Sequence, residues 1–122
     1  MKKILIVEDD NFLSNAYRVK LTKAGYKIVL ASDGQQAINT LESFIPDLIL
    51  LDLVMPRMDG FAVLEKLKAN ELSAKIPVIV TSNLGQKEDI DRAINLGANS
   101  YVVKSDLSLD DLVKKIKAAI GS

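Results

Sequence analysis

The sequence predicts a doubly wound α/β domain, organised as (βα)5 around a five-stranded parallel sheet. Short runs rich in Ile, Leu and Val alternate along the chain with segments of helical periodicity. The apolar runs are continuous, which is typical of strands that are buried on both faces of a parallel sheet. Right-handed crossovers then place helices on both faces of that sheet. A chain of 122 residues fits one domain, which we assign to residues 1–122.

Five segments are expected to form the strands, and they share a core of branched apolar residues. Their expected ranges are 4–7, 27–31, 48–51, 78–82 and 101–103. Each range is four or five residues long, apart from the last, which is shorter. These lengths are usual for strands in globular domains.

Five helices are expected between and after the strands, each with apolar residues at helical spacing. Gly25 is placed to end the first helix, Asp33 can cap the second, and Ser108 begins a sequence that resembles a capping box. The expected ranges are 12–24, 33–41 with an extension to residue 45 left open, from about 60 onward, 87–96 and 108–120. The apolar stripe of the last helix consists of Leu109, Leu112, Val113, Ile116 and Ile120.

Composition excludes several classes of function. The chain has no cysteine and no histidine, which excludes disulfides, thiolate metal sites, His-based acid–base chemistry and a phosphohistidine on this chain. The 16 basic and 16 acidic side chains balance, and we expect no direct binding to nucleic acid. The apolar runs are too short to cross a bilayer, and the N-terminus does not resemble a signal peptide. We therefore expect no membrane contact and a cytoplasmic location.

Polar side chains gather where the predicted strands end. They are Glu8, Asp9 and Asp10 after the first strand, Asp52 after the third, Ser82 and Asn83 at the end of the fourth, and Lys104 after the fifth. Ligands of open α/β sheets bind outside the carboxyl ends of the strands. The sequence therefore predicts a ligand site at this edge of the sheet.

These residue types suit phosphoryl chemistry with a divalent cation. Carboxylate oxygens without nitrogen or sulfur ligands favour Mg²⁺, Mn²⁺ or Ca²⁺. An aspartate can be a nucleophile, and a lysine can pair with a carboxylate and then with a phosphoryl oxygen. Each residue alone has an ordinary explanation: the acids can cap a helix, and Asp52 or Lys104 can be a turn or solvated residue. Their joint occurrence favours the functional interpretation of Asp9, Asp52 and Lys104.

The sequence resembles response-regulator receiver domains of two-component signalling from residue 4 to about residue 120. Five features in order carry the resemblance: the acidic pair Glu8-Asp9, the segment Asp52-Leu-Val-Met-Pro-Arg-Met-Asp-Gly60, Ser82, the pair Gly97-Ala98, and Lys104. The resemblance implies a flavodoxin-like strand order of 2-1-3-4-5 and a phosphoacceptor switch that uses Mg²⁺. It implies a histidine kinase or histidine phosphotransfer protein as the phosphoryl donor.

The resemblance also implies a role for each matching residue. Asp52 would accept the phosphoryl group, which Lys104 would contact. The metal would be held by Asp9 and Asp52 directly, by Glu8 partly through water, and by the backbone carbonyl of Val54. Ser82 would reorient towards the phosphoryl group and Tyr101 would swing inwards, altering the surface of the fourth helix, fifth strand and fifth helix. An ordinary aromatic residue packed at a sheet edge is the other interpretation of Tyr101.

The sequence departs from the family pattern after Lys104 and after Ser82. Ser105 replaces the usual proline, so we expect a trans or a strained peptide bond in place of the family's cis bond. Asn83 is larger than the usual residue and could narrow access to Asp52 or bond the phosphoryl group. Val54 and Leu84 occupy the two positions that tune phosphoryl lifetime, and neither can position a water. A long-lived phosphoryl form is therefore expected.

Alternative functions remain open at this stage. A phosphorylation-independent interaction module of the same fold would need a broken site. A phosphatase of the haloacid dehalogenase type would need a second Asp where Val54 stands, and no glycine-rich phosphate loop indicates a nucleotide site. We therefore expect a switch that catalyses its own phosphorylation and dephosphorylation, rather than an enzyme with a separate substrate. It would act on a downstream protein target or through an output domain that is missing here.

Overall fold

Five parallel strands form one sheet in the computed structural model, which describes residues 1–121. Ser122, the last residue of the expected domain, lies outside the described residues. The strands are β1 (Lys3–Val7), β2 (Lys27–Ala31), β3 (Leu48–Leu51), β4 (Val78–Ser82) and β5 (Ser100–Val103). Their order is β2-β1-β3-β4-β5, and all neighbouring pairs are parallel. The predicted fold class and strand order are confirmed.

Five α-helices alternate with these strands. They are α1 (Asn11–Lys23), α2 (Gly34–Thr40), α3 (Gly60–Ala69), α4 (Lys87–Asn95) and α5 (Leu109–Ile120), and a 3₁₀ turn, η1 (Lys104–Asp106), follows β5. Side-chain oxygens cap four of the helices, because they accept the free backbone N–H groups of the first turn. The capping residues are Asp10 for α1, Asp33 for α2, Asp59 for α3 and Ser108 for α5. The predicted caps Asp33 and Ser108 are confirmed.

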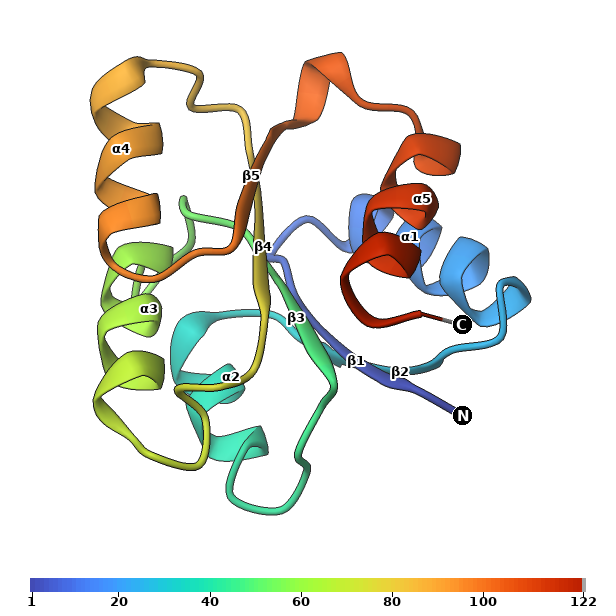
Figure 1. Cartoon of the computed structure of the whole chain (residues 1–122), viewed down its shortest axis with the longest axis horizontal. Helices are drawn as coiled ribbons and strands as arrows, with labels where there is room; N and C mark the ends of the chain where they lie inside the picture. The colour runs from blue at the N-terminus through green and yellow to red at the C-terminus, as the bar shows by residue number, and fades with distance from the viewer. Residues whose placement is uncertain (122) are drawn as a thin grey trace.

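The helices cover both faces of the sheet. Figure 1 shows α1 and α5 on one face and α2, α3 and α4 on the other. Alternate residues of each strand point to opposite faces. In β1, Leu5 and Val7 join the core cluster under α2, α3 and α4, whereas Ile4 and Ile6 join the cluster under α1 and α5. Burial on both faces explains why the strand sequences are continuously apolar.

Several element bounds shift by one residue from the sequence-based expectation, and α2 and α5 show the two differences that need an explanation. Helix α2 ends at Thr40 and does not extend to Ile45. A proline ring disfavours helical geometry in the residue before it, and Ile45 precedes Pro46. An extension of the helix to Ile45 is therefore unfavourable. Leu109, assigned to the apolar stripe of the last helix, is 37% exposed because it is the first residue of α5 and lies beyond the packed core. Within residues 1–121, no helix is long and apolar enough to span a bilayer.

Candidate functional site

The predicted polar residues line one cleft of about 330 Å³ at the carboxyl edge of the sheet. Strand pairing explains why they meet. Val7 of β1 is paired in register with Leu51 of β3, so the residues that follow these two strands emerge side by side. The lining consists of Glu8, Asp9, Asp10, Leu13, Asp52, Val54, Ser82, Asn83, Leu84 and Lys104.

Three carboxylates in this cleft can hold a metal ion. One oxygen from each of Glu8, Asp9 and Asp52 lies within 4.8 Å of the others. Glu8 and Asp52 are 2% and 4% exposed, whereas Asp9 is exposed to solvent. An all-oxygen set with one open side fits a hard divalent cation that keeps some of its waters. The chemistry of the residues present is therefore suited to Mg²⁺ or a similar ion.

Glu8 is already bonded through both of its oxygens. Its Oε1 accepts a bond of 2.5 Å from Lys104 Nζ, and its Oε2 accepts one of 3.2 Å from the backbone N–H of Asp10. The Oδ1 of Asp10 is used to cap α1, because it accepts the backbone N–H groups of Phe12 and Leu13. Asp10 is thus a cap, while Asp9 and Asp52 keep oxygens that a cation can reach.

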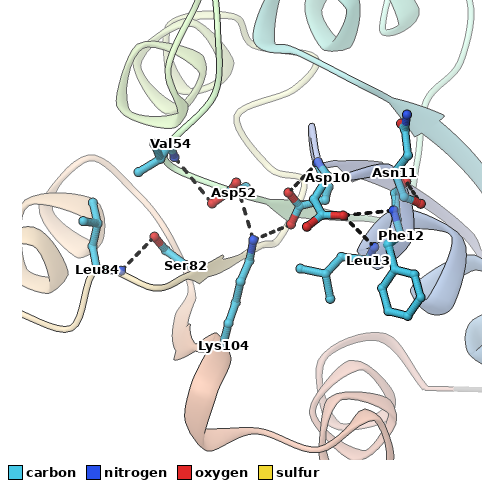
Figure 2. A network of polar contacts seen from close by, with 11 residues as sticks. Asp10, Asn11, Phe12, Leu13, Asp52, Val54, Ser82, Leu84 and Lys104 are labelled. Atoms are coloured by element: carbon cyan, nitrogen blue, oxygen red, sulfur yellow. Dashed lines mark hydrogen bonds and ion pairs between the residues drawn. The ribbon is translucent and has the colours of Figure 1, made fainter.

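Lys104 is the cation that links the two buried carboxylates. Its Nζ lies 2.5 Å from Glu8 Oε1 and 3.5 Å from Asp52 Oδ2, and its side chain is 11% exposed. Figure 2 shows the extended Lys104 side chain reaching up to Asp52. Lys104 follows β5, which neighbours β4 rather than β3, so its long side chain spans the end of β4. The Lys104–Ser105 peptide bond is trans. A trans bond was one of the two forms that the sequence led us to expect.

Burial and neighbouring charges shift the pKa values of Glu8, Asp52 and Lys104. Burial raises the pKa of Glu8 from 4.5 to about 7, although the bond from Lys104 lowers it, and the Asp52 charge adds to the rise. Burial also raises the pKa of Asp52, while Lys104 and the Val54 N–H oppose the rise. Burial lowers the pKa of Lys104, but its bond to Glu8 and the Asp52 charge outweigh burial and raise it overall. Lys104 therefore stays charged beside the carboxylates.

The chain around Asp52 is held by backbone hydrogen bonds. The Asp52 N–H donates to the Val7 carbonyl at 3.0 Å, and the Gly60 N–H donates to the Leu53 carbonyl at 2.8 Å. A Cβ at Gly60 would lie 2.5 Å from the Asp52 carbonyl oxygen and 2.6 Å from Leu53 Cα. Only glycine allows the start of α3 to come this close to the end of β3. Val54 is 59% exposed at the cleft, where its N–H donates to Asp52 Oδ1 at 3.4 Å.

Ser82 and Tyr101 are linked through the backbone of Leu84. Ser82 is fully buried, and its Oγ accepts a bond of 3.2 Å from the Leu84 N–H (Figure 2). The Leu84 carbonyl accepts a bond of 2.5 Å from the Tyr101 hydroxyl. Asn83, between them, is exposed at the cleft. No sequence pattern predicts this link, because it runs through main-chain atoms of a loop.

Comparison with known proteins identifies the relatives of this chain. A family model described as "Response regulator receiver domain" matches residues 4–117. A curated relative from Synechocystis sp., the DNA-binding dual master transcriptional regulator RpaA, is 34% identical over 98% of this chain and 49% of its own length. The chain thus spans about half the length of that relative.

Solved structures agree with the family match. The Mn²⁺-bound form of response regulator Rcp1 superposes with a TM-score of 0.86 at 31% identity, over 97% of this chain and 93% of that chain. The receiver domain of a sensor histidine kinase from Pseudomonas aeruginosa, with a magnesium ion in its active-site cleft, gives a TM-score of 0.89 at 28% identity. That alignment covers 99% of this chain and 98% of the other.

Proposed function

This chain belongs to the response regulator receiver domain family and is a signalling switch of two-component systems, and we propose that Asp52 is its phosphoacceptor. One observation carries the proposal. The buried carboxylate of Asp52 contacts the Lys104 ammonium and also belongs, with Glu8 and Asp9, to the acidic cluster that can hold a metal ion. This arrangement puts a nucleophile, a cation and metal ligands at one point of the cleft.

We propose Mg²⁺ as the ion that this cluster holds. Asp9, Asp52 and the Val54 carbonyl would be direct ligands, and Glu8 would act partly through water because its two oxygens already accept bonds. The bound ion would supply charge neutralisation for the transferring phosphoryl oxygens. The receiver domain with magnesium in its cleft and the Mn²⁺-bound response regulator both support this assignment.

The reaction is transfer of a phosphoryl group from a phosphohistidine. An Asp52 carboxylate oxygen attacks phosphorus, the P–N bond breaks, and its electron pair leaves on the donor imidazole. The product is an acyl phosphate on Asp52. Lys104 moves from Asp52 towards a phosphoryl oxygen and stabilises its charge, while it retains its bond to Glu8. The domain thereby catalyses its own phosphorylation and later dephosphorylation, without a separate substrate.

The phosphoryl group would be sensed by Ser82 and Tyr101. Ser82 would donate its hydroxyl to a phosphoryl oxygen if its side chain reorients, and that movement of Oγ would disturb the bond that it accepts from the Leu84 N–H. Because Leu84 also holds the Tyr101 hydroxyl, the disturbance reaches β5. A local charge thus biases the surface formed by α4, β5 and α5. Asn83 would border the phosphoryl group from the exposed side of the cleft.

The partners follow from the family at a coarse level. Receiver domains work with histidine kinases or phosphotransfer proteins, and we propose such a donor for this chain, acting in the cytoplasm. The output is either a downstream protein or an output domain, as in the DNA-binding relative that is about twice as long. In both cases the α4–β5–α5 surface carries the signal.

Intact-mass measurement tests the proposal. The parent, Asp52→Asn and Asp10→Asn are incubated with Mg²⁺ and acetyl phosphate. The parent and Asp10→Asn should gain one phosphoryl group, because Asp10 only caps α1 and asparagine caps equally well. Asp52→Asn should gain none. Equal modification of all three proteins would contradict the assignment, and no modification together with no Mg²⁺ binding would favour a phosphorylation-independent interaction module.

A further inference from the structure

The N-terminal end of α2 touches the loop that connects β3 to α3. This β3–α3 loop, residues 52–59, carries both Asp52 and Val54, whereas α2 contributes no residue to the cleft. Arg57 in the loop has φ 68°, and it is the one non-glycine residue with a positive φ among residues 1–121. A positive φ is unfavourable for a residue with a side chain, and it persists only where neighbouring contacts hold the backbone in place.

Asp33 supplies one of these contacts. Its Oδ1 caps α2 by accepting the Gln36 N–H at 2.8 Å, and its Oδ2 accepts Arg57 Nη1 at 3.1 Å. The Asp33 side chain is 9% exposed, whereas that of Arg57 is 76% exposed. An ion pair with one partner so exposed holds the loop only weakly. The firmer contact must therefore come from packing.

Gly34 supplies that packing. A Cβ at this position would lie 2.8 Å from Met58 Cβ and 2.8 Å from Val63 Cγ2, and it would overlap the Met58 carbonyl oxygen. The backbone of α2 and the backbone of the loop are thus in direct contact. A methyl group at Gly34 would have to displace either Met58 or the first turn of α2.

The loop is partly anchored in the core. Leu53 and Met55 belong to the buried core cluster, whereas Val54, Pro56 and Arg57 are exposed. Inside the loop, the Met58 N–H donates to the Pro56 carbonyl at 2.9 Å. A displacement of Met58 therefore acts through this bond on Pro56, which lies two residues from Val54 at the cleft.

We propose that Asp33 and Gly34 are positioning residues for the metal site, acting through Arg57 and Met58 to hold Val54 beside the acidic cluster. The inference rests on the proposed function, because it assumes that Val54 contributes its carbonyl to a bound cation. Neither Asp33 nor Gly34 touches the cleft, so their effect is on the affinity of the site rather than on its chemistry.

Calorimetric titration with Mg²⁺ tests the inference on the parent and three variants. Gly34→Ala should weaken Mg²⁺ binding at least about fivefold. Asp33→Asn should weaken it about twofold, because asparagine keeps the cap on α2 but removes the charge that Arg57 bonds. Gly85→Ala is the matched control, since a Cβ there lies 3.8 Å from its nearest neighbours, and it should leave the affinity unchanged.

Binding is measured under conditions where urea titration shows each variant to be folded, so a change in affinity is not a loss of structure. Parental affinity in Gly34→Ala overturns the inference. If Gly34→Ala does not fold, Asp33→Asn decides, and parental affinity there overturns it. If the parent does not bind Mg²⁺, both this inference and the proposed function are overturned. If the parent binds Mg²⁺ and the variants bind it with the same affinity, only this inference is overturned.

Discussion

Raising the pH from about 5 to about 8 in the absence of divalent cations should destabilise the domain, because Glu8 must ionise inside the cleft. Burial raises the pKa of Glu8 from 4.5 to about 7 in the folded protein. Between these values the folded protein holds a proton that the unfolded chain has already released. The free energy of unfolding therefore falls as the pH rises through this window.

The size of the loss follows from the same values. Each pH unit between 4.5 and about 7 costs at most about 1.4 kcal/mol, so Glu8 alone accounts for a loss of up to about 3 kcal/mol. The raised pKa of Asp52 adds a loss of the same sign that begins at lower pH. The raised pKa of Lys104 adds stability that is fully present below pH 10.5 and is constant across the window.

Urea unfolding at several pH values, in the presence of a chelator, measures this loss. Glu8→Gln removes the titrating group with little change in size and should flatten the profile to the part that Asp52 contributes. Glu65→Gln, on the exposed side of α3, is the matched control and should keep the parental profile. A parental stability that stays constant or rises between about pH 5 and pH 8 would show that Glu8 does not ionise at a cost to the fold, as would an unchanged slope in Glu8→Gln.

Three further outcomes are expected. Mg²⁺ at about 100 times its dissociation constant should raise the free energy of unfolding at pH 8 by about 2.7 kcal/mol, and Asp9→Asn should lose most of this gain in urea titrations. The phosphoryl group should persist on the isolated domain for minutes or longer, because Val54 and Leu84 cannot position a water; decay within seconds by intact mass would contradict this. Gly60→Ala should cost about 1–3 kcal/mol in thermal unfolding, because the new methyl group would lie 2.5 Å from the Asp52 carbonyl oxygen, and parental stability would show that the loop adapts.

The strands were more predictable than the helix ends. β2, β3 and β4 have the expected bounds, and β1 and β5 each begin one residue earlier than expected. Burial on both faces makes their sequences continuously apolar, which is a strong signal. The end of α2 was harder, because the apolar residues Leu41 and Ile45 continue the helical spacing after the helix has ended at Thr40. The Ile45–Pro46 step excludes helical geometry at Ile45, but it does not explain why the helix ends as early as Thr40.

The candidate site was predictable to the extent that strand ends determine it. Parallel strands end at one edge of the sheet, so the acids and Lys104 could be expected together before any geometry was known. Contacts that depend on loop conformation could not be expected. The bonds that join Ser82 and Tyr101 through Leu84 are of this kind. The ion pair between Asp33 and Arg57 is also of this kind, because the two residues are 24 positions apart and no local sequence pattern encodes their contact.

Chemical mapping of the phosphorylated residue tests whether Asp52 is the phosphoacceptor. The domain is treated with acetyl phosphate and Mg²⁺, the acyl phosphate is reduced with borohydride to the corresponding alcohol, and the digested peptides are sequenced by mass spectrometry. We expect the reduced side chain at Asp52 and nowhere else. Reduction at Asp9 or at another carboxylate, with Asp52 unmodified, would contradict it.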